Sequence, residues 1–592
     1  MEEIKKLKIA VKKERDISVR GFTVPAFANK GMLVFAAGLI IAILIQSMAR
    51  LYTLHSNVFD LGIFDSLLFS MADAGQWQLA FTSHAHWFAL LFEQIYKIPV
   101  TGLAPYALVL VQAVLLVSPI LWFYRTYGAL IALCYAGYYP LWANALFDFH
   151  FDHLAVPLLF GFYWGLLRRK PGVAVLCASL LMLVKEPFAL QSMACGLLMI
   201  AILFQRKEFG YQTEEKSSQY KLAAGGIWLV LAGGLYFYFS TSVLIPYFTV
   251  DEWPGVIGGS GFEWLGGDIA GVMKSVIGKP HVIVWSVLTN PLKLQYLFVI
   301  FGLLAFIPLL RPTLLLPALP MLGISMLSQV RNYYDYNTHY SAGLIIPVFF
   351  AFIYGLPRAA GYFQSILRWL RLQTDHHGGR ATSLMTVESF YKKEDRSRGS
   401  EIESMHKRVF FFLVLGWVLA GHAMLSPSPV SRLFWSEKVW SFRLDAYVPH
   451  ERTTMIREAI TRLIPREADV VVSVQNNLNW GPLAHRRVYS AFPAGVSDPI
   501  QKVDLSNRTL KNLWEYIQTG NKPRAAPGEY YADYVVLDLK RPLFLVDRGC
   551  DWVYGQCKND KVVAEFNDRV AYTRLHYETI YDQDGFMIFG KK

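Results

Sequence analysis

Charged residues are scarce in this chain. Only 17% of its 592 residues are Asp, Glu, Lys or Arg, whereas 54% are hydrophobic; a soluble domain is about a quarter charged. The scarcity excludes a chain made of soluble domains alone, because apolar runs long enough to cross a bilayer recur along most of it. The net charge of +12 does not indicate a nucleic-acid partner, since no nucleic-acid-binding motif is present and the basic residues gather in loops.

Cysteine is also sparse, at five residues. Cys134, Cys177 and Cys195 lie in apolar runs, where we expect them to be packing residues. Cys550 and Cys557 lie close together in a polar C-terminal region. A disulfide between these two is chemically allowed outside the cytoplasm, and two free thiols are the alternative.

Two further features are missing, a signal-peptide cleavage site and an internal repeat. No small-residue cleavage site follows the first apolar run, so we expect this run to stay as an anchor. The lack of a repeat disfavours a secondary transporter built from duplicated halves.

The hydropathy pattern predicts a polytopic α-helical membrane protein with about eleven transmembrane helices. The multi-span domain covers 31–357, and the last helix covers 409–425. The predicted spans are 32–48, 103–122, 127–144, 154–167, 171–185, 187–205, 222–245, 294–310, 312–328, 341–357 and 409–425.

Basic segments predict the orientation. Lys and Arg concentrate at 1–30 and at 358–408, and the short loops 168–170 and 206–207 are basic too. All four fall on one side of the predicted spans, which the positive-inside rule makes the cytoplasm. The cytoplasmic (inner) membrane is the expected location, with the N-terminus in the cytoplasm and the C-terminus outside. The expected outside loops are 49–102, 145–153, 246–293 and 329–340.

Residues 430–592 differ in composition from the spans and predict a small α/β domain on the outer face. The runs 470–474 and 534–537 are rich in Val and read as buried strands, and 453–463 reads as an amphipathic helix. The domain follows the last span directly.

Two acidic residues stand just after the first span. Asp60 and Asp65 lie in the first outside loop, where a carboxylate can act as a general base or bind a metal. Both are candidate catalytic residues. Asp60 serving only to cap an interfacial helix is the alternative.

Acidic residues and histidines also alternate with phenylalanines at 147–153. Asp148, His150 and Asp152 are candidate ligands of a divalent metal, Mn²⁺ before Mg²⁺, because they mix oxygen and nitrogen donors. An internally paired interfacial cluster is the alternative. His84 and His86 are weaker metal candidates.

Candidate substrate-binding residues come from two more segments. Lys185 and Glu186 lie between two apolar runs, and Arg331 and His339 lie in the loop between the ninth and tenth predicted spans. Lysine and arginine bind phosphate, and a structural ion pair is the alternative for Lys185 and Glu186. Since all these residues fall on the outer side, a common cavity there would suit an anionic lipid-linked substrate and a polar acceptor.

The same segments resemble a prokaryotic family of membrane proteins known as domain of unknown function 2079, which is grouped with the type C (GT-C) glycosyltransferases. The segments that carry the resemblance are 57–65 (NVFDLGIFD), 83–84 (SH), 147–150 (FDFH), 183–186 (LVKE), 339–342 (HYSA) and 532–538 (ADYVVLD). Type C enzymes take sugars from polyprenyl phosphates, place a catalytic acid in the first outside loop, and often need a divalent metal. The resemblance therefore implies a GT-C-like fold and a membrane-lipid donor, with Asp60 as the best match to the catalytic acid and Asp65 second.

We therefore expect a glycosyltransferase-like protein that transfers a sugar from a polyprenyl-phosphate donor on the outer membrane face. A transporter or lipid flippase with the same charged cavity is one alternative, and a non-catalytic membrane scaffold is another. The scaffold predicts that the Asp and His clusters point apart.

Overall fold

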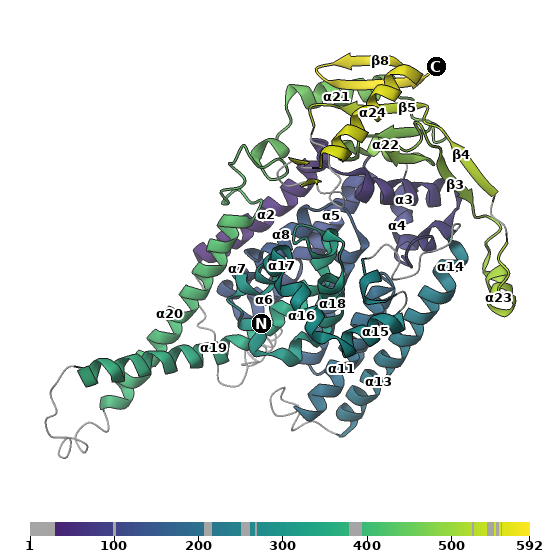
Figure 1. Cartoon of the computed structure of the whole chain (residues 1–592). Coiled ribbons are helices and arrows are strands. Elements are labelled where there is room, and N and C mark those ends of the chain that lie inside the picture. The colour runs from purple at the N-terminus through teal and green to yellow at the C-terminus, as the bar shows by residue number, and fades with distance from the viewer. Residues whose placement is uncertain are drawn as a thin grey trace, which may run out of the picture.

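The computed structural model shows a body of helices beneath a mixed α/β domain formed by the C-terminal region (Figure 1). It describes residues 30–98, 102–205, 216–249, 261–266, 269–377, 394–523, 526–541, 550–551, 556–557 and 559–592.

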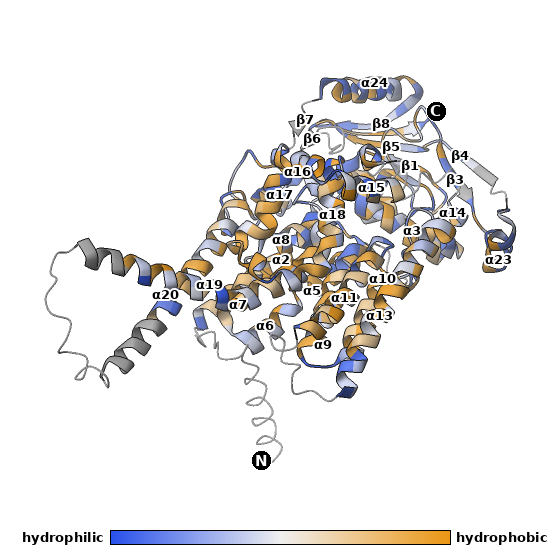
Figure 2. Ribbon diagram, turned by 60° about the horizontal axis from the view of Figure 1, so that its bottom comes forward, coloured by the Kyte–Doolittle hydropathy of each residue, from blue (hydrophilic) through white to orange (hydrophobic). Residues whose placement is uncertain are grey.

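Several helices of the body are long and apolar enough to cross a membrane. Among the described residues, six segments have the length and hydropathy of a membrane-spanning helix. The number is seven if two helices that meet at 289–290 with a bend of 85° form one span. The six are Lys30–Tyr52, Ala104–Tyr127, Pro187–Phe204, Lys216–Phe248, His339–Leu370 and Met405–Leu425. Figure 2 shows hydrophobic residues spread over this body. The chain is therefore a multi-span helical membrane protein.

The count of eleven stays a prediction. Four apolar helices of the described chain, Phe151–Leu167, Pro171–Met182, Ile269–Gly278 and Pro312–Leu327, have only 10–17 residues, whereas a helix that crosses a bilayer needs about 20. The last two predicted spans belong to helices that extend well beyond them into the basic segment 358–408, namely Ala342–His377 and Glu394–Leu425.

The helices of the body are α2 (Lys30–Tyr52), α3 (Ile63–Ala74), α4 (Ala89–Tyr96), α5 (Ala104–Val117), α6 (Pro119–Tyr127), α7 (Ala129–Ala136), α8 (Tyr139–Leu146), α9 (Ala155–Leu167), α10 (Pro171–Met182), α11 (Pro187–Phe204), α13 (Lys216–Phe239), α14 (Ile245–Phe248), α15 (Ile269–Gly278), α16 (Pro280–Leu288), α17 (Pro291–Phe301), α18 (Leu319–Leu327), α19 (Ala342–His377) and α20 (Glu394–Leu425). The segments 49–102 and 246–293, expected as outside loops, thus contain helices α3, α4, α15 and α16.

Small residues let the helices of the body approach closely. A Cβ atom added at Gly196 of α11 would lie 2.5 Å from the carbonyl oxygen of Gly226 on α13. The two backbones therefore touch, as small residues allow in membrane helix pairs.

The C-terminal domain contains a five-stranded sheet in the order β2-β1-β5-β9-β8. Strands β2, β1 and β5 are parallel, β9 is antiparallel to β5, and β8 is antiparallel to β9. The strands expected at 470–474 and 534–537 are present as β1 and β5, and the helix expected at 453–463 is present as α21. The elements are α21 (Glu451–Leu463), β1 (Val472–Val474), α22 (Gly481–Ala484), β2 (Tyr489–Ala491), β3 (Ile500–Asp504), α23 (Leu510–Thr519), β4 (Ala526–Tyr530), β5 (Tyr534–Asp538), β6 (Cys550–Asp551), β7 (Gln556–Cys557), α24 (Asp560–His576), β8 (Tyr577–Gln583) and β9 (Phe586–Lys591).

Hydrogen bonds hold the C-terminal domain against the segment that follows α2. The guanidinium of Arg541 forms an ion pair with Asp538 and donates hydrogen bonds to the carbonyl oxygens of Leu54 and Asn477. Ser56 forms an isolated antiparallel bridge with Asn479. These contacts fix the domain over the segment after α2, which contains Asp60 and Asp65.

Candidate functional site

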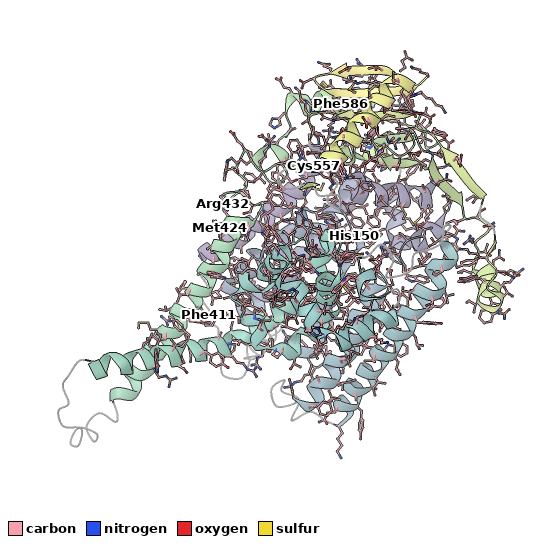
Figure 3. The ribbon with its side chains drawn as sticks, viewed as in Figure 1. His150, Phe411, Met424, Arg432, Cys557 and Phe586 are labelled. Carbon is pink, nitrogen blue, oxygen red and sulfur yellow. The ribbon has the colours of Figure 1, made fainter. Side chains whose placement is uncertain are left out.

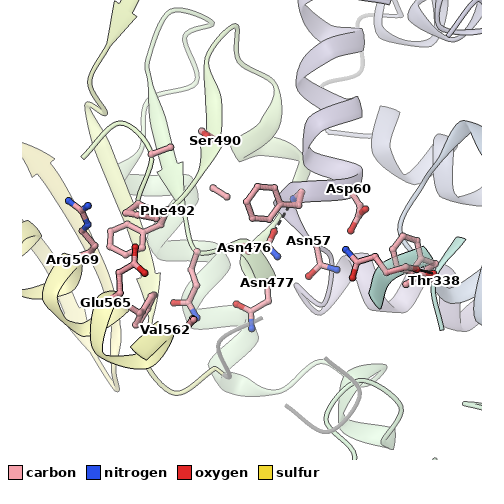
Figure 4. Close-up of a pocket in the computed structure, with 18 of the residues that line it drawn as sticks. Asn57, Asp60, Thr338, Asn476, Asn477, Ser490, Phe492, Val562, Glu565 and Arg569 are labelled. Atoms are coloured by element: carbon pink, nitrogen blue, oxygen red, sulfur yellow. Dashed lines mark hydrogen bonds between the residues drawn. The ribbon is translucent and has the colours of Figure 1, made fainter. Parts of the chain in front are cut away.

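A cavity of about 730 Å³ lies where the helical body meets the C-terminal domain (Figure 4). Its body side is lined by Asn57, Phe59, Asp60, Phe147, His150, Asn332, Thr338, His339 and Tyr340. Its domain side is lined by Gln475, Asn476, Asn477, Ser490, Ala491, Phe492, Pro493, Ala494, Asp498, Pro499, Val562, Glu565, Phe566 and Arg569. The volume is that of a small-molecule site, and residues from segments more than 400 positions apart build it.

Asp60 lies in a short π-helical turn, Val58–Gly62, between α2 and α3. Such turns are rare and frequently occur at functional sites. The backbone N–H of Phe59 donates a 2.9 Å hydrogen bond to the side-chain oxygen of Asn476, which fixes the turn against the domain. A Cβ atom added at Gly62 would lie 2.9 Å from the ring of Tyr489, so this close approach requires glycine.

Asp148 supports the same turn. One of its carboxylate oxygens accepts hydrogen bonds from the backbone and the side chain of Asn57, at 2.9 and 2.7 Å. Burial and the neighbouring negative charge of Asp148 raise the pKa of Asp60 to about 8. The pKa of Asp148 is raised too, mainly by burial, which Arg50 opposes. An acid whose pKa lies near the working pH is suited to proton transfer.

Three other predicted residues meet in one buried cluster, which we call the His-Asp-His cluster: His150, Asp152 and His339. Nδ1 of His150 lies 2.9 Å from Oδ1 of Asp152, and Nε2 of His339 lies 3.6 Å from Oδ2 of Asp152. The two imidazole rings stack with centroids 3.7 Å apart. Burial lowers the pKa of His150, against the opposing effect of Asp152. Figure 3 places His150 in the helical body, below Cys557 and Phe586 of the domain.

Lys185 lies beside this cluster. Its Nζ atom is 4.0 Å from Oδ1 of Asp152 and 5.9 Å from the ring centroid of Tyr340. The ammonium group is buried, and its positive charge lies next to the carboxylate of Asp152.

Glu186 points to a different partner. Its carboxylate lies 2.7 Å from Nδ1 of His84 and accepts a hydrogen bond from the backbone of Ala85. Although burial opposes it, His84 holds the pKa of Glu186 at about 2. His86 is buried with Nδ1 3.3 Å from the carbonyl oxygen of Val184. His84 and His86 therefore connect the segment 83–86 to the segment 184–186, beside the His-Asp-His cluster.

Asp65 does not line the cavity. It is fully buried, accepts a 2.5 Å hydrogen bond from the hydroxyl of Tyr96, and lies 3.1 Å from Nε2 of His485. This placement favours a role in holding the domain against helices α3 and α4.

Arg331 also lies outside the main cavity. It pairs with Asp335 at 3.7 Å and lines a separate, smaller cavity of about 170 Å³. The structure therefore separates Arg331 from His339, although only seven residues lie between them in the sequence.

The residues on the domain side of the cavity were not predicted from the sequence. Gln475, Asn476 and Asn477 directly follow β1, and Phe492 follows β2. Ligands of α/β sheets bind outside the carboxyl ends of parallel strands. A run of three amides after a predicted strand was therefore a usable signal.

The two cysteines of the domain are the partners of the predicted disulfide bond. Cys557 is disulfide-bonded, and Cys550 is its Cα partner in the β6–β7 ladder. Cys134, Cys177 and Cys195 are free thiols. The backbone register supports the predicted bond between Cys550 and Cys557.

The fold and the cavity define a multi-span membrane protein with a polar site between its helices and an attached α/β domain. The family model "Predicted membrane protein (DUF2079)" matches residues 50–375, which is more than half of the chain. The chain belongs to this family, and the matched region contains Asp60, the His-Asp-His cluster and Lys185. No curated protein matches the chain.

Proposed function

We propose that this protein transfers a sugar from a polyprenyl-phosphate donor to a polar acceptor at the outer face of the cytoplasmic membrane. The observation that carries the proposal is that one cavity is lined by a proton-accepting carboxylate, Asp60, and by two imidazoles, His150 and His339. The ammonium of Lys185 does not line the cavity but lies 4.0 Å from Asp152, the partner of both imidazoles. A scaffold would not need these groups to converge.

Asp60 is the proposed general base. The acceptor hydroxyl oxygen attacks C1 of the sugar while Asp60 takes the hydroxyl proton. The bond between C1 and the phosphate oxygen breaks, its electron pair stays with the phosphate, and the sugar is inverted. Positioned general bases of this kind contribute about 10²–10⁴-fold to a rate.

Lys185 and the His-Asp-His cluster are the proposed phosphate side of the cavity. His150 and His339 line it, and Lys185 lies directly behind Asp152. A divalent metal held by the cluster would supply positive charge for the leaving phosphate. Cationic groups aimed at a departing phosphate stabilise charge that grows in the transition state.

The domain side is the proposed acceptor side. Its amides are neutral hydrogen-bonding groups, and its charged groups are Asp498, Glu565 and Arg569. Figure 4 shows Phe492, Glu565 and Arg569 at the end of the cavity away from Asp60 and Thr338. Such a wall suits a hydroxyl-rich acceptor better than a second lipid tail.

The proposed orientation places the domain outside the cell and the basic ends of α13, α19 and α20 in the cytoplasm. The domain and the basic ends lie at opposite ends of the body (Figure 1). The positive-inside rule then assigns the sides.

The test is a turnover assay with the full chain in nanodiscs and a panel of polyprenyl-phosphate sugars. We expect release of polyprenyl phosphate with sugar transfer or hydrolysis, and a loss of at least about 100-fold in the Asp60→Asn variant. Asp568→Asn is the matched control, because Asp568 is exposed on α24. Equal turnover by Asp60→Asn would remove Asp60 from its role, and lipid movement without sugar release would indicate a transporter.

A further inference from the structure

We propose that His150, Asp152 and His339 form a three-ligand site for a transition-metal ion, Zn²⁺ or Mn²⁺. The inference deepens the proposed function, but it rests on the geometry of the cluster and needs no sugar substrate. His339 comes from a loop 187 residues after Asp152, so the site exists only in the folded chain.

The spacing of the donor atoms fits one ion. One ligand atom from each residue lies within 4.8 Å of the other two, and all three residues are buried. Two ligands on a tetrahedral ion with bonds of about 2.1 Å are about 3.4 Å apart. The carboxylate of Asp152 lies at comparable distances from both imidazoles, through different oxygens: Oδ1 is 2.9 Å from Nδ1 of His150, and Oδ2 is 3.6 Å from Nε2 of His339.

The cluster also leaves donor atoms unsatisfied. Both ring nitrogens of His339 are buried and have no hydrogen-bond partner among the described residues, whereas Oδ1 of Asp152 lies 2.9 Å from Nδ1 of His150. Asp152 and His339 are each only 4% exposed. Buried polar atoms are nearly always paired, so unpaired atoms aimed at one point indicate a missing ligand.

The donor types select the class of metal. Two imidazoles and one carboxylate suit Zn²⁺, Mn²⁺ or Fe²⁺, whereas Mg²⁺ and Ca²⁺ prefer oxygen ligands throughout. Three protein ligands leave at least one coordination position open, as in catalytic rather than structural zinc sites. His150 and His339 both line the cavity, so an ion held by them would be accessible from it.

Lys185 marks where an anion would approach this site. Its Nζ lies 4.0 Å from Asp152, beyond hydrogen-bonding distance. A cation held by the cluster and the ammonium would attract a phosphate oxygen between them. Without an anion the two positive charges repel, so we expect phosphate to tighten metal binding.

The test measures metal binding by the full chain in nanodiscs without any sugar donor. The protein is stripped with a chelator, dialysed against Zn²⁺, Mn²⁺ or Mg²⁺, and analysed by elemental mass spectrometry. Co²⁺ then reports coordination through its visible spectrum. We expect one Zn²⁺ or Mn²⁺ per chain, at least about 10-fold weaker binding in Asp152→Asn and His339→Ala, and no change in His281→Ala, an exposed histidine on α16.

Asp152→Asn keeps the side-chain shape, and its melting curve without metal shows whether it still folds. If folded Asp152→Asn and His339→Ala bind as much metal as the wild type, the site is refuted. Stoichiometric Mg²⁺ binding in place of Zn²⁺ or Mn²⁺ would refute the assignment of metal class. Metal binding without sugar transfer would refute the proposed function alone.

A second observation concerns α23, whose apolar face is exposed among the residues that the structure describes. Leu510, Trp514 and Ile517 are 65%, 63% and 45% exposed. They follow the i, i+4, i+7 spacing of one helix face. We infer that this face lies in the headgroup region of the same membrane that the body spans.

The position of α23 supports this inference. The hydroxyl of Tyr247 donates a 3.0 Å hydrogen bond to the carbonyl oxygen of Thr509, and the Tyr247 and Tyr516 rings are 5.3 Å apart. Tyr247 lies at the end of the candidate span Lys216–Phe248. Figure 1 shows α23 at the far end of β3 and β4, away from the five-stranded sheet. A helix tied to the end of a span lies at membrane-surface height, where Trp is favoured.

A photoreactive phenylalanine analogue tests this placement. It is introduced at Trp514 or, as control, at Glu515, which is exposed on the opposite face of α23. The protein is irradiated in nanodiscs of phosphatidylethanolamine and phosphatidylglycerol. We expect lipid adducts at position 514 at least about five times as often as at 515, since only that face meets lipid. Equal labelling of both positions would overturn the inference.

Discussion

Replacing Asp60 with asparagine is expected to stabilise the protein while removing its activity. Burial and the negative charge of Asp148 raise the pKa of Asp60 from 3.8 to about 8. Between these values the unfolded chain releases a proton that the folded protein keeps, so stability falls as the pH rises. Asparagine has nearly the same shape and no proton to lose, and therefore removes this cost.

The magnitude follows from the interval between the two pKa values. At about 1.4 kcal/mol for each pH unit, the interval from 3.8 to about 8 sets a ceiling of roughly 6 kcal/mol. Asp60 is partly exposed to the cavity, where water screens its charge, so we expect about 2–3 kcal/mol. The gain should be complete above about pH 8 and absent below about pH 4.

The assay is thermal unfolding followed by tryptophan fluorescence, in nanodiscs and over a range of pH. The Asp60→Asn variant should melt above the wild type at pH about 8, and the difference should shrink steadily toward pH about 5. Asp568→Asn should show no such trend, because Asp568 is exposed. A difference that is negative or independent of pH would refute the reasoning about the site.

Three further predictions concern the domain and its side of the membrane. Arg541→Ala should destabilise the contact between the domain and the body by about 2 kcal/mol, since it removes a hydrogen bond from a charged group to the carbonyl oxygen of Leu54, and limited proteolysis should then release the domain faster; unchanged release would contradict this. Burial opposes protonation of His485, but Asp65 raises its pKa. The contact between His485 and Asp65 should therefore be fully present below about pH 6.5 and weaken as the pH rises. The His485→Gln variant should abolish this pH dependence of proteolysis. A cysteine at Glu578, exposed in the domain, should react with an impermeant thiol reagent on intact cells, whereas one at Tyr220, exposed at the start of α13, should react only after permeabilisation; the reverse pattern would invert the orientation.

Local patterns in the sequence predicted much of the fold. The Val-rich runs at 470–474 and 534–537 became β1 and β5 because a buried parallel strand is apolar on both faces. Span boundaries were harder to predict. Proline and glycine break the apolar runs into short helices, as at Pro119, Gly128 and Gly137, and hydropathy alone does not register where a helix bends.

The site was predictable where its residues are neighbours in the chain. His150 and Asp152 are two positions apart, so their proximity follows from the sequence. The partnership with His339 does not, because it depends on the packing of distant loops. Asp60 and Asp65 looked alike in the sequence, yet Asp60 lies in the π-helical turn and Asp65 in α3, so their side chains point in different directions. Asp65 therefore meets Tyr96 and His485, whereas Asp60 faces the cavity.

The most direct measurement of the central claim is sugar release from a polyprenyl-phosphate sugar by the purified full chain in nanodiscs. The account predicts that wild type and Asp568→Asn release polyprenyl phosphate, whereas folded Asp60→Asn is slower by at least about 100-fold. If no donor of the panel is turned over, or if folded Asp60→Asn is as fast as the wild type, the cavity does not perform sugar transfer as proposed.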